Sequence, residues 1–303
     1  MSNIPPEIAS LLTSLRLGEA IHLDHLTVVP LLGPGVDLDV DLLDESVPVG
    51  RTTVREVSDR GDVNQVLVEH SGARLLLLLA GQQILGAKQN RVFNTSLLVR
   101  EGPPVAVPVS CVERGRWQHV SDRFVASETT VTTSLRSSML HRVTRSTTMG
   151  RGYDAGQNEV WDEIQGHLER TQTTSGTAAF DAAYQAARPR VDEQISRLAP
   201  AANQLGAAVV RDEKVLAIDV LATPSIWARC WKTLLRGVLA EADRGAPSAS
   251  AASLVAAALQ TLHATSAVRR QAPGGSETVH GTAGSMAVGA VVHSGHVVHL
   301  SAA

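Results

Sequence analysis

The dominant spacing of the apolar residues changes near Tyr153, from the two-residue period of strands to a mixture of helical and strand periods. This change limits the possible folds more than any other feature. From residue 20 to about residue 135, short alternating or β-branched segments are separated by Gly, Pro, Asp and Ser, which favour turns. The segments are IHLDHLTVVPLL, VDLDVDLL, REVSDRG, NQVLVEH, ARLLLLLAG, VFNTSLLV, VAVPVSCVE and ETTVTTSL. Strands of this number and length predict a sandwich or an open barrel.

The segment 36–42 shows the strand period most clearly, because Val and Leu alternate there with Asp37, Asp39 and Asp41. Such alternation is typical of an antiparallel strand with one face buried and the other in water. We therefore expect the three aspartates to lie on the outside of the sheet.

Helical spacing follows Tyr153, and a short helix is also expected over residues 5–16. Thr223 and Pro224 open the clearest helix, as N-cap and first helical residue. Asp154 is the expected N-cap of an earlier helix, and Pro189 is expected to interrupt another, because proline has no N–H to donate. The predicted helices cover 160–168, 177–198, a stretch that begins at 224, and 251–263. Two hairpins are also predicted, one over 204–222 and one that follows Gly274 and Gly275 and runs through Gly295.

These patterns predict an α+β fold with an antiparallel β-rich N-terminal half, a sandwich or open barrel, and a mixed helix/hairpin C-terminal half. We assign residues 1–150 to a mostly β subdomain and residues 151–303 to a helical subdomain with two β-hairpins. The two are expected to pack as one unit, since 303 residues suffice for one large core.

Composition excludes two classes of partner. A net charge of −3 and an aromatic content of 3% argue against nucleic acid, which requires a basic surface or stacking side chains. The longest apolar run, Leu75 to Ala80, is far shorter than the roughly 20 residues of a membrane span. With no signal peptide and two distant cysteines, the expected location is the cytoplasm. The sequence identifies neither a cofactor nor an oligomeric state.

The most unusual segment is the polar run 86–91, which lies between the apolar runs LLLLLA and SLLV. In an extended strand, Lys88 and Asn90 would share one face and Gln89 and Arg91 the other, so that neither face is apolar. Buried polar groups require partners. Lys88 and Arg91 suit a bound anion, and the amides of Gln89, Asn90 and Asn94 suit a base, a sugar or a peptide group. The alternatives are a polar turn with a solvated edge and an internal hydrogen-bond network.

A second candidate is the segment 105–113, in which Cys111 continues an apolar row. This pattern is typical of a buried core thiol. The alternative is a nucleophile at the end of a strand, with Glu113 and a histidine such as His119 nearby; such a cysteine needs access and a lowered pKa.

Histidines gather at the C-terminal hairpin, where Ser294 and Gly295 form a turn that places His293 opposite His296. His299 would lie on the other face and His280 lies upstream, so no third metal ligand is evident and no metal site is predicted. The motifs GxxxxGK[ST], GxGxxG, HExxH and GxSxG do not occur.

The segments GAKQNRVFNTSLLV and VPVSCVERGRW, in this order and spacing, resemble the family of ARG-and-rhodanese-phosphatase-superfamily-associated protein domains. QLGAAVVRDEKVLAIDVLATPSIWARCWKTLLRG and VVHLSA resemble its second half, so the resemblance covers nearly the whole chain. In this family an acidic residue often precedes the glycine of GAKQNR, where this chain has Gln82 and Gln83.

The family's name implies association with ADP-ribosylglycohydrolase-type and phosphatase-type genes, and hence a role near ADP-ribose or nucleotide-derived signalling. The resemblance implies a site among the matched positions, which are Lys88, Gln89, Asn90, Arg91, Asn94, Cys111, Glu113, Arg116, Trp117 and His299.

Three functions follow from these residues. In the first, Lys88 and Arg91 hold an anionic small molecule. In the second, the protein is a hydrolase or transferase with Cys111 as nucleophile or Glu113 as general acid/base. In the third, the polar segment is the internal network of a structural or regulatory scaffold. The sequence leaves open whether the protein is an enzyme.

Overall fold

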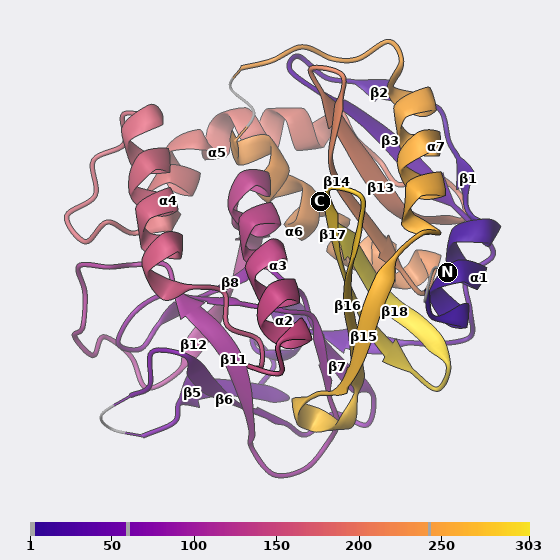
Figure 1. Ribbon diagram of the computed structural model, residues 1–303. Helices are drawn as coiled ribbons and strands as arrows, with labels where there is room; N and C mark the ends of the chain where they lie inside the picture. Colours follow the sequence, from indigo (N-terminus) through magenta and orange to yellow (C-terminus); the bar gives the residue numbers. More distant parts are fainter. Residues whose placement is uncertain (1–3, 59–60, 242–243) are drawn as a thin grey trace.

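The structure of the protein, a computed structural model, describes residues 4–58, 61–241 and 244–303 (Figure 1). Helices and strands are mixed along the chain in an α+β arrangement rich in strands, as the sequence predicts. The helices are α1 (Pro6–Ser14), α2 (Leu43–Ser46), α3 (Thr133–Thr148), α4 (Gln157–Arg170), α5 (Phe180–Ser196), α6 (Pro224–Glu241), α7 (Ala251–Leu262) and the 3₁₀ turn η1 (Pro273–Gly275). None of the helices in these ranges has both the length and the apolar character that crossing a bilayer requires.

The largest sheet joins both halves of the chain. Its order is β1-β3-β13-β14-β18-β17-β16-β15, with β2 also on β3, and all of its pairs are antiparallel. Because β3 pairs with β13, the boundary near residue 150 does not separate one sheet from another. The strands are β1 (Arg16–Leu17), β2 (Ile21–His22), β3 (Thr27–Leu32), β13 (Gln204–Arg211), β14 (Lys214–Leu221), β15 (Ser266–Gln271), β16 (Glu277–Ala283), β17 (Met286–His293) and β18 (His296–Ala302).

Two smaller sheets come from the N-terminal half. One has the order β12-β8-β9-β11-β6-β5 and the other the order β10-β7-β4. Their apolar side chains form a common core, in which Phe93 and Phe124 are fully buried. The strands are β4 (Val40–Leu42), β5 (Thr52–Glu56), β6 (Gln65–His70), β7 (Leu75–Leu78), β8 (Gln82–Gly86), β9 (Arg91–Phe93), β10 (Leu97–Val99), β11 (Val105–Cys111) and β12 (Phe124–Thr130).

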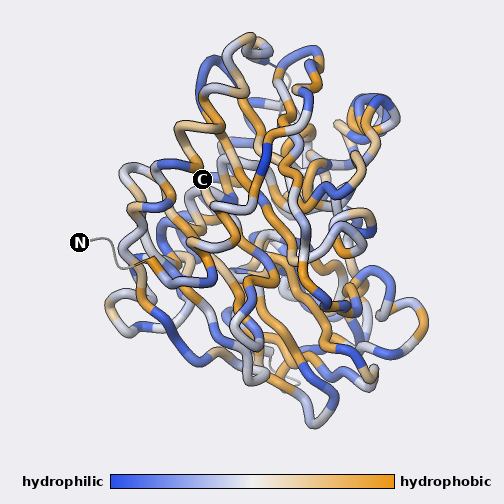
Figure 2. Tube along the Cα trace, turned by 90° about the vertical axis from the view of Figure 1, so that its right-hand side faces the viewer, coloured by the Kyte–Doolittle hydropathy of each residue, from blue (hydrophilic) through white to orange (hydrophobic). Residues whose placement is uncertain are grey.

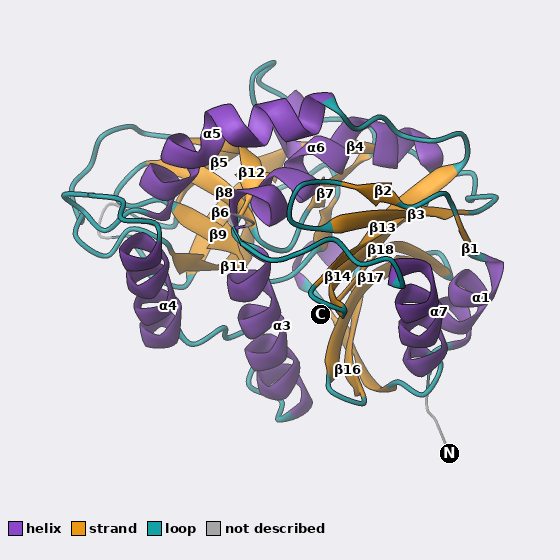
Figure 3. Cartoon of the chain, turned by 90° about the horizontal axis from the view of Figure 1, so that it is seen from above, coloured by secondary structure: helices purple, strands orange, loops and turns teal. Residues whose placement is uncertain are grey.

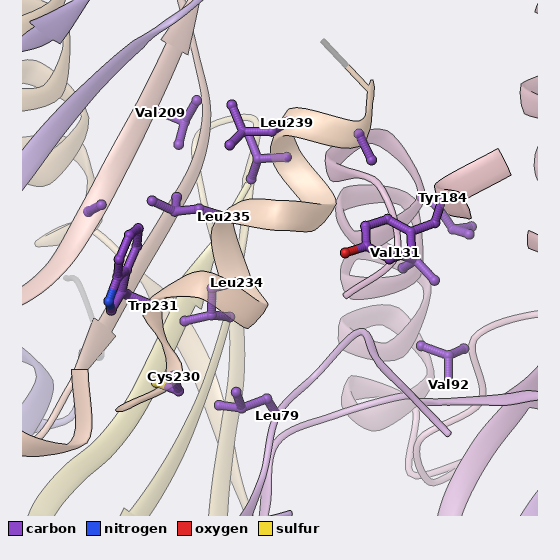
Figure 4. Close-up of a cluster of buried hydrophobic side chains, with 14 of the residues drawn as sticks. Leu79, Val92, Val131, Tyr184, Val209, Cys230, Trp231, Leu234, Leu235 and Leu239 are labelled. Carbon is purple, nitrogen blue, oxygen red and sulfur yellow. The ribbon is translucent and has the colours of Figure 1, made fainter. Parts of the chain in front are cut away.

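Helix α6 joins the large sheet to the smaller ones. Thr223 caps it, because its Oγ1 accepts a hydrogen bond of 3.1 Å from the N–H of Ile226. Figure 4 shows the α6 side chains between Val209 of β13 on one side and Val131, which follows β12, on the other. The large apolar residues of α6 from Ile226 to Leu239 are buried in this core, and the helix begins at Pro224, as the sequence predicts.

The opposite face of the large sheet is covered by α1 and α7, which lie beside each other in the view from above (Figure 3). Buried residues of both helices, such as Ile8 and Val255, pack there against apolar side chains of the sheet. The hydropathy view shows apolar stretches running along the strands inside the molecule (Figure 2). The central strands of the sheet are therefore buried on both faces, which the nearly continuous apolar runs of β13 and β14 require.

The prediction for segment 36–42 was wrong in two respects. Only residues 40–42 form a strand, and this strand runs parallel to β7. Asp41 is buried instead of exposed, with its Oδ2 3.6 Å from His70 Nε2 and 3.5 Å from Arg51 Nε. Asp37 and Asp39 are exposed, as expected, so the alternation combines two solvated carboxylates with one paired internal carboxylate, Asp41.

Three helix predictions need correction as well. Helix α3 covers a stretch where no helix was predicted. Its sequence is rich in Ser and Thr and poor in apolar residues, so it shows no clear apolar stripe. Helix α5 continues through Pro189, where a break was predicted. Buried Tyr184 and Val191 hold it on either side of the proline, which offsets a cost of about 3 kcal/mol. Asp154 accepts a hydrogen bond from the N–H of Gly156, and Gly156 is the N-cap of α4.

Candidate functional site

The polar segment 86–91 is the turn of a hairpin and not a continuous strand. Strand β8 ends at Gly86 and β9 begins at Arg91. The turn requires positive φ at Gly86 (117°) and at Ala87 (44°). Inside it, Asn90 Oδ1 accepts a hydrogen bond of 3.0 Å from the N–H of Gly86. The turn is therefore closed by one of its own predicted site residues.

Arg91, the first residue of β9 after this turn, is fully buried and has no exposed side-chain surface. Its Nη1 donates to Gln89 Oε1 at 2.8 Å and to the sulfur of Cys111. Its Nη2 donates to the carbonyl of Asp62 at 3.3 Å and lies 3.6 Å from Glu56 Oε1. Both terminal nitrogens thus have protein partners, so that Arg91 and Gln89 form an internal network rather than an open anion site.

Arg116 fixes the same turn from the other side. It donates to the carbonyl of Ala87 at 2.8 Å, to Asn90 Oδ1 at 3.1 Å and to Glu113 Oε2 at 2.6 Å. Glu113 also accepts a hydrogen bond of 2.8 Å from the Thr177 hydroxyl. Burial opposes ionisation of Glu113, but the hydrogen bonds from Arg116, Thr177 and the Asn90 N–H together lower its pKa. A general acid must hold a proton near neutral pH, and these contacts favour the charged form.

Cys111 is fully buried, where the sequence placed either a core thiol or a nucleophile. Burial raises the pKa of its thiol to about 12, although the neighbouring Arg91 acts in the opposite direction. In this conformation the thiol has neither the access nor the lowered pKa of a nucleophile. The second cysteine, Cys230, is buried in the core that α6 forms.

The outer side of the turn borders a cavity of about 540 Å³. Lys88 Nζ lies 5.5 Å from the centroid of the Trp117 ring, and the Arg91 guanidinium carbon lies 5.5 Å from the same centroid. Trp117 is 48% exposed, which is unusual for the largest side chain of the site. The cavity is lined by Arg55, Glu56, Ser58, Lys88, Trp117, His119, Ser121 and Asp122.

The inner edge of this cavity holds an unpaired carboxylate oxygen. Glu56 Oε1 accepts from the N–H of Lys88 at 3.3 Å, but Glu56 Oε2 has no hydrogen-bond partner within the described residues. A Cβ placed on Gly61 would lie 3.3 Å from Glu56 Oε2, 3.3 Å from Trp117 Cζ2 and 3.2 Å from Lys88 Cδ. Glycine at this position thus lets an anion, a cation and an indole converge around one point.

A second polar network connects the segment 94–96 to the rest of the molecule. Asn94 donates to the carbonyl of Tyr153 at 2.9 Å and accepts from the Ser110 hydroxyl at 2.8 Å. Thr95 Oγ1 lies 3.1 Å from His280 Nε2. The predicted site residue Asn94 therefore joins strands and does not face the cavity.

His299 belongs to this second network. Its Nδ1 lies 2.7 Å from Ser96 Oγ and its Nε2 lies 3.1 Å from Asp219 Oδ1. Asp219 accepts two hydrogen bonds from Arg136, at 2.6 and 3.0 Å. The order Ser–His–Asp is that of a nucleophilic triad, but Ser96 is only 5% exposed and its Oγ also accepts the N–H of Ala80. The contacts therefore describe a buried link between the sheets.

His280 gives this link a dependence on pH. Burial lowers the pKa of His280 to about 4, from 6.5 in the unfolded chain, so between these values only the unfolded chain binds the proton. The stability due to neutral His280 is complete above pH 6.5 and is lost as pH falls towards 4. We expect the free energy of unfolding to fall by about 2 kcal/mol from pH 7 to pH 5, and to fall less in His280→Gln. Urea titrations at both pH values measure this; equal slopes in both proteins would contradict it.

The remaining histidines do not gather into a metal centre with any other residue that the structure describes. His293 pairs with His296 across the turn of β17 and β18, as the sequence predicts. Residues 4–58, 61–241 and 244–303 contain no group of three or more His, Cys, Asp or Glu side chains suited to a metal ion.

Sequence reasoning missed Glu56, Arg55 and Asp219. The first two lie on β5, which carries no motif, and reach the cavity only because β5 and the 86–91 turn are neighbours in space. The sequence did contain a signal for Asp219, which is the lone acidic residue inside the apolar run VLAIDVLA. A carboxylate in such a run requires a buried hydrogen-bond partner. The partner, Arg136, lies on the helix that was not predicted.

Comparison with known proteins identifies a family for this chain. The family model described as ARG and Rhodanese-Phosphatase-superfamily-associated Protein domain matches residues 14–303. Neither the curated proteins nor the solved structures contain a match to this chain.

Proposed function

Since the chain belongs to the family of ARG and Rhodanese-Phosphatase-superfamily-associated Protein domains, we propose that it binds an anionic small molecule in the cavity beside Lys88 and Trp117. A nucleotide or an ADP-ribose-related compound is the class that the family association favours. The proposal places the protein in the cytoplasm, because its two unpaired cysteines suit a reducing compartment.

The observation that carries this proposal is the exposed indole of Trp117 beside the Lys88 ammonium, at the wall of a cavity of about 540 Å³. Lys88 supplies a positive charge for a phosphate or carboxylate, and Arg55 lines the same cavity. The exposed part of Trp117 offers an apolar surface to the rest of the ligand. An anion with an attached apolar or ring-shaped group fits this combination best.

Glu56 adds a requirement for a hydrogen-bond donor. Its Oε2 is buried without a partner among the described residues, and it lies next to Lys88 and Trp117 around Gly61. A ligand hydroxyl or amino group would remove the cost of this unmade hydrogen bond. A phosphorylated compound with free hydroxyl groups, such as a sugar phosphate or a nucleotide, combines the donor with the anion.

The contacts of the inner residues favour the internal network, one of the alternatives that the sequence left open, over direct contact with the ligand. Arg91, Gln89 and Asn90 are occupied by protein partners, which supports a network that positions Lys88 and Trp117 rather than one that contacts the ligand. Burial of Cys111 and the ion pair of Glu113 likewise give little support to a hydrolase or transferase that uses these two groups.

A thermal-shift screen tests the proposal. The panel contains ADP-ribose, NAD, nucleotides, sugar phosphates and inorganic phosphate. A ligand at a hundred times its Kd adds about 2.7 kcal/mol to the stability of the folded protein. We expect Lys88→Ala to weaken binding of the best ligand at least tenfold, because one charged hydrogen bond contributes about 1.5–3 kcal/mol. Trp117→Ala should weaken it to a similar extent.

Lys232→Ala is the matched control, because Lys232 Nζ also lies over an indole, 5.6 Å from the centroid of Trp231, but on helix α6. This variant should bind like the natural protein. If no compound shifts the melting temperature, or if Lys88→Ala binds the best ligand with unchanged affinity, the proposal fails.

A further inference from the structure

We infer that the ligand site continues past Arg55 into a second anion subsite, formed by Arg51, Arg55 and Arg123, so that the ligand carries two separate anionic groups. This inference rests on the proposed function, because it extends the same site. Its geometric basis is a second cavity, of about 370 Å³, that shares the walls Arg55 and Asp122 with the first.

Strand β5 places the two cavities next to each other. Thr53 and Arg55 lie on the same face of this strand, since they are two residues apart, and their side chains are separated by about 7 Å. Both line the second cavity, whereas Arg55 and the following Glu56 line the first. A single extended molecule can therefore contact Lys88 at one end and the arginines at the other.

The charges of the second cavity favour an anion. Its walls include three arginines and two carboxylates, those of Glu69 and Asp122. Asp122 is already 3.1 Å from His119 Nε2, and Arg51 is 3.5 Å from Asp41. Within the described residues, Arg55 and Arg123 have no carboxylate oxygen within 4.0 Å. Two guanidinium groups thus remain available for a phosphate, which they can bind through pairs of parallel hydrogen bonds.

The lining also leaves room for such a group. Gly50 lies at the edge of the second cavity, and a Cβ added to it would meet no atom within 4 Å. Thr53 and Ser71 line the same space; the Ser71 hydroxyl donates to the carbonyl of Arg51 at 3.2 Å, so Thr53 is the hydroxyl residue suited to donate to a phosphate oxygen. The chemical class that fits both cavities is a bisphosphorylated sugar or nucleoside, with its two phosphates on different positions of the molecule.

Calorimetric titration with adenosine 5′-monophosphate and adenosine 3′,5′-bisphosphate tests this inference. We expect the bisphosphate to bind at least tenfold more tightly than the monophosphate. Arg123→Ala should remove this difference and leave the affinity for the monophosphate unchanged. Arg55→Ala should weaken both, because Arg55 lines both cavities. Arg197→Ala is the control, since this arginine pairs with Asp24 at 2.9 Å in another part of the molecule.

Two results would overturn the second subsite while the proposed function stands. One is equal affinity of the natural protein for the two nucleotides. The other is an Arg123→Ala variant that retains the full preference for the bisphosphate. If neither nucleotide binds and no other compound of the thermal-shift panel does, the proposed function and this inference fail together.

Discussion

Replacing Asp219 with alanine should lower the free energy of unfolding by about 3–5 kcal/mol, the usual result of removing one member of a buried ion pair. Asp219 is 6% exposed and accepts hydrogen bonds from both terminal nitrogens of Arg136. Burial disfavours its charge, yet Arg136 and His299 together hold the pKa of Asp219 far below its ordinary value. Alanine would leave the Arg136 guanidinium buried with Ser301 as its remaining side-chain partner.

Urea denaturation followed by circular dichroism measures this loss. Asp219→Asn keeps the shape and some hydrogen bonds, so we expect it to be less damaging than alanine and to remain measurable if the alanine variant does not fold. Asp24→Asn is the control: Asp24 also pairs with an arginine, but at the surface, where such pairs contribute little. Equal effects at positions 24 and 219 would show that burial of the Arg136 pair is not important for stability.

Arg91→Ala should lower the free energy of unfolding by about 3 kcal/mol or more, even in the absence of any ligand. The side chain is fully buried and connects Gln89, Glu56 and the carbonyl of Asp62. Its removal leaves the Glu56 carboxylate without its cation and a void beneath Trp117. Arg91→Lys keeps the charge but not the planar fork, and we expect an intermediate loss.

Lys88→Ala is the matched control for Arg91, because it changes a cation of the same turn that is only partly buried. We expect this variant to alter stability by less than about 0.5 kcal/mol while it weakens ligand binding. The two variants therefore separate the positioning network from the ligand contact. An Arg91→Ala protein that keeps its stability and loses only ligand binding would return Arg91 to the direct contact role that its sequence suggested.

Local patterns predicted the elements that local forces determine. Thr223, Pro224 and the apolar stripe define helix α6 within one segment, and the structure agrees with them. The hairpin predicted over 204–222 is likewise present as β13 and β14, with Asp212 and Glu213 at positive φ in the turn between them. In such segments the capping residue, the periodicity and the turn chemistry all favour one structure.

Long-range partners explain what the sequence could not predict. Helix α3 has few apolar residues, and it is stabilised by packing on β16 and β17 and by the ion pair of Arg136 with a residue 83 positions away. The same holds for the candidate site. The need of Arg91 for partners was predictable, but Glu56 and Asp62 could not be identified as those partners without the fold. The cavity itself exists only because β5 lies beside the turn of β8 and β9.

The position of β18 in the large sheet has a consequence for how the chain is made. Residues 296–302 lie between β14 and β17, so that a strand synthesised after both of its neighbours completes the interior of the sheet. While the ribosome is still translating this region, β14 presents an unpaired edge and α6 lacks part of its support. Such long-range pairing slows folding and exposes aggregation-prone edges. We expect the nascent chain to depend on chaperones until residue 302 has emerged, and its soluble yield to rise when translation is slowed by low temperature.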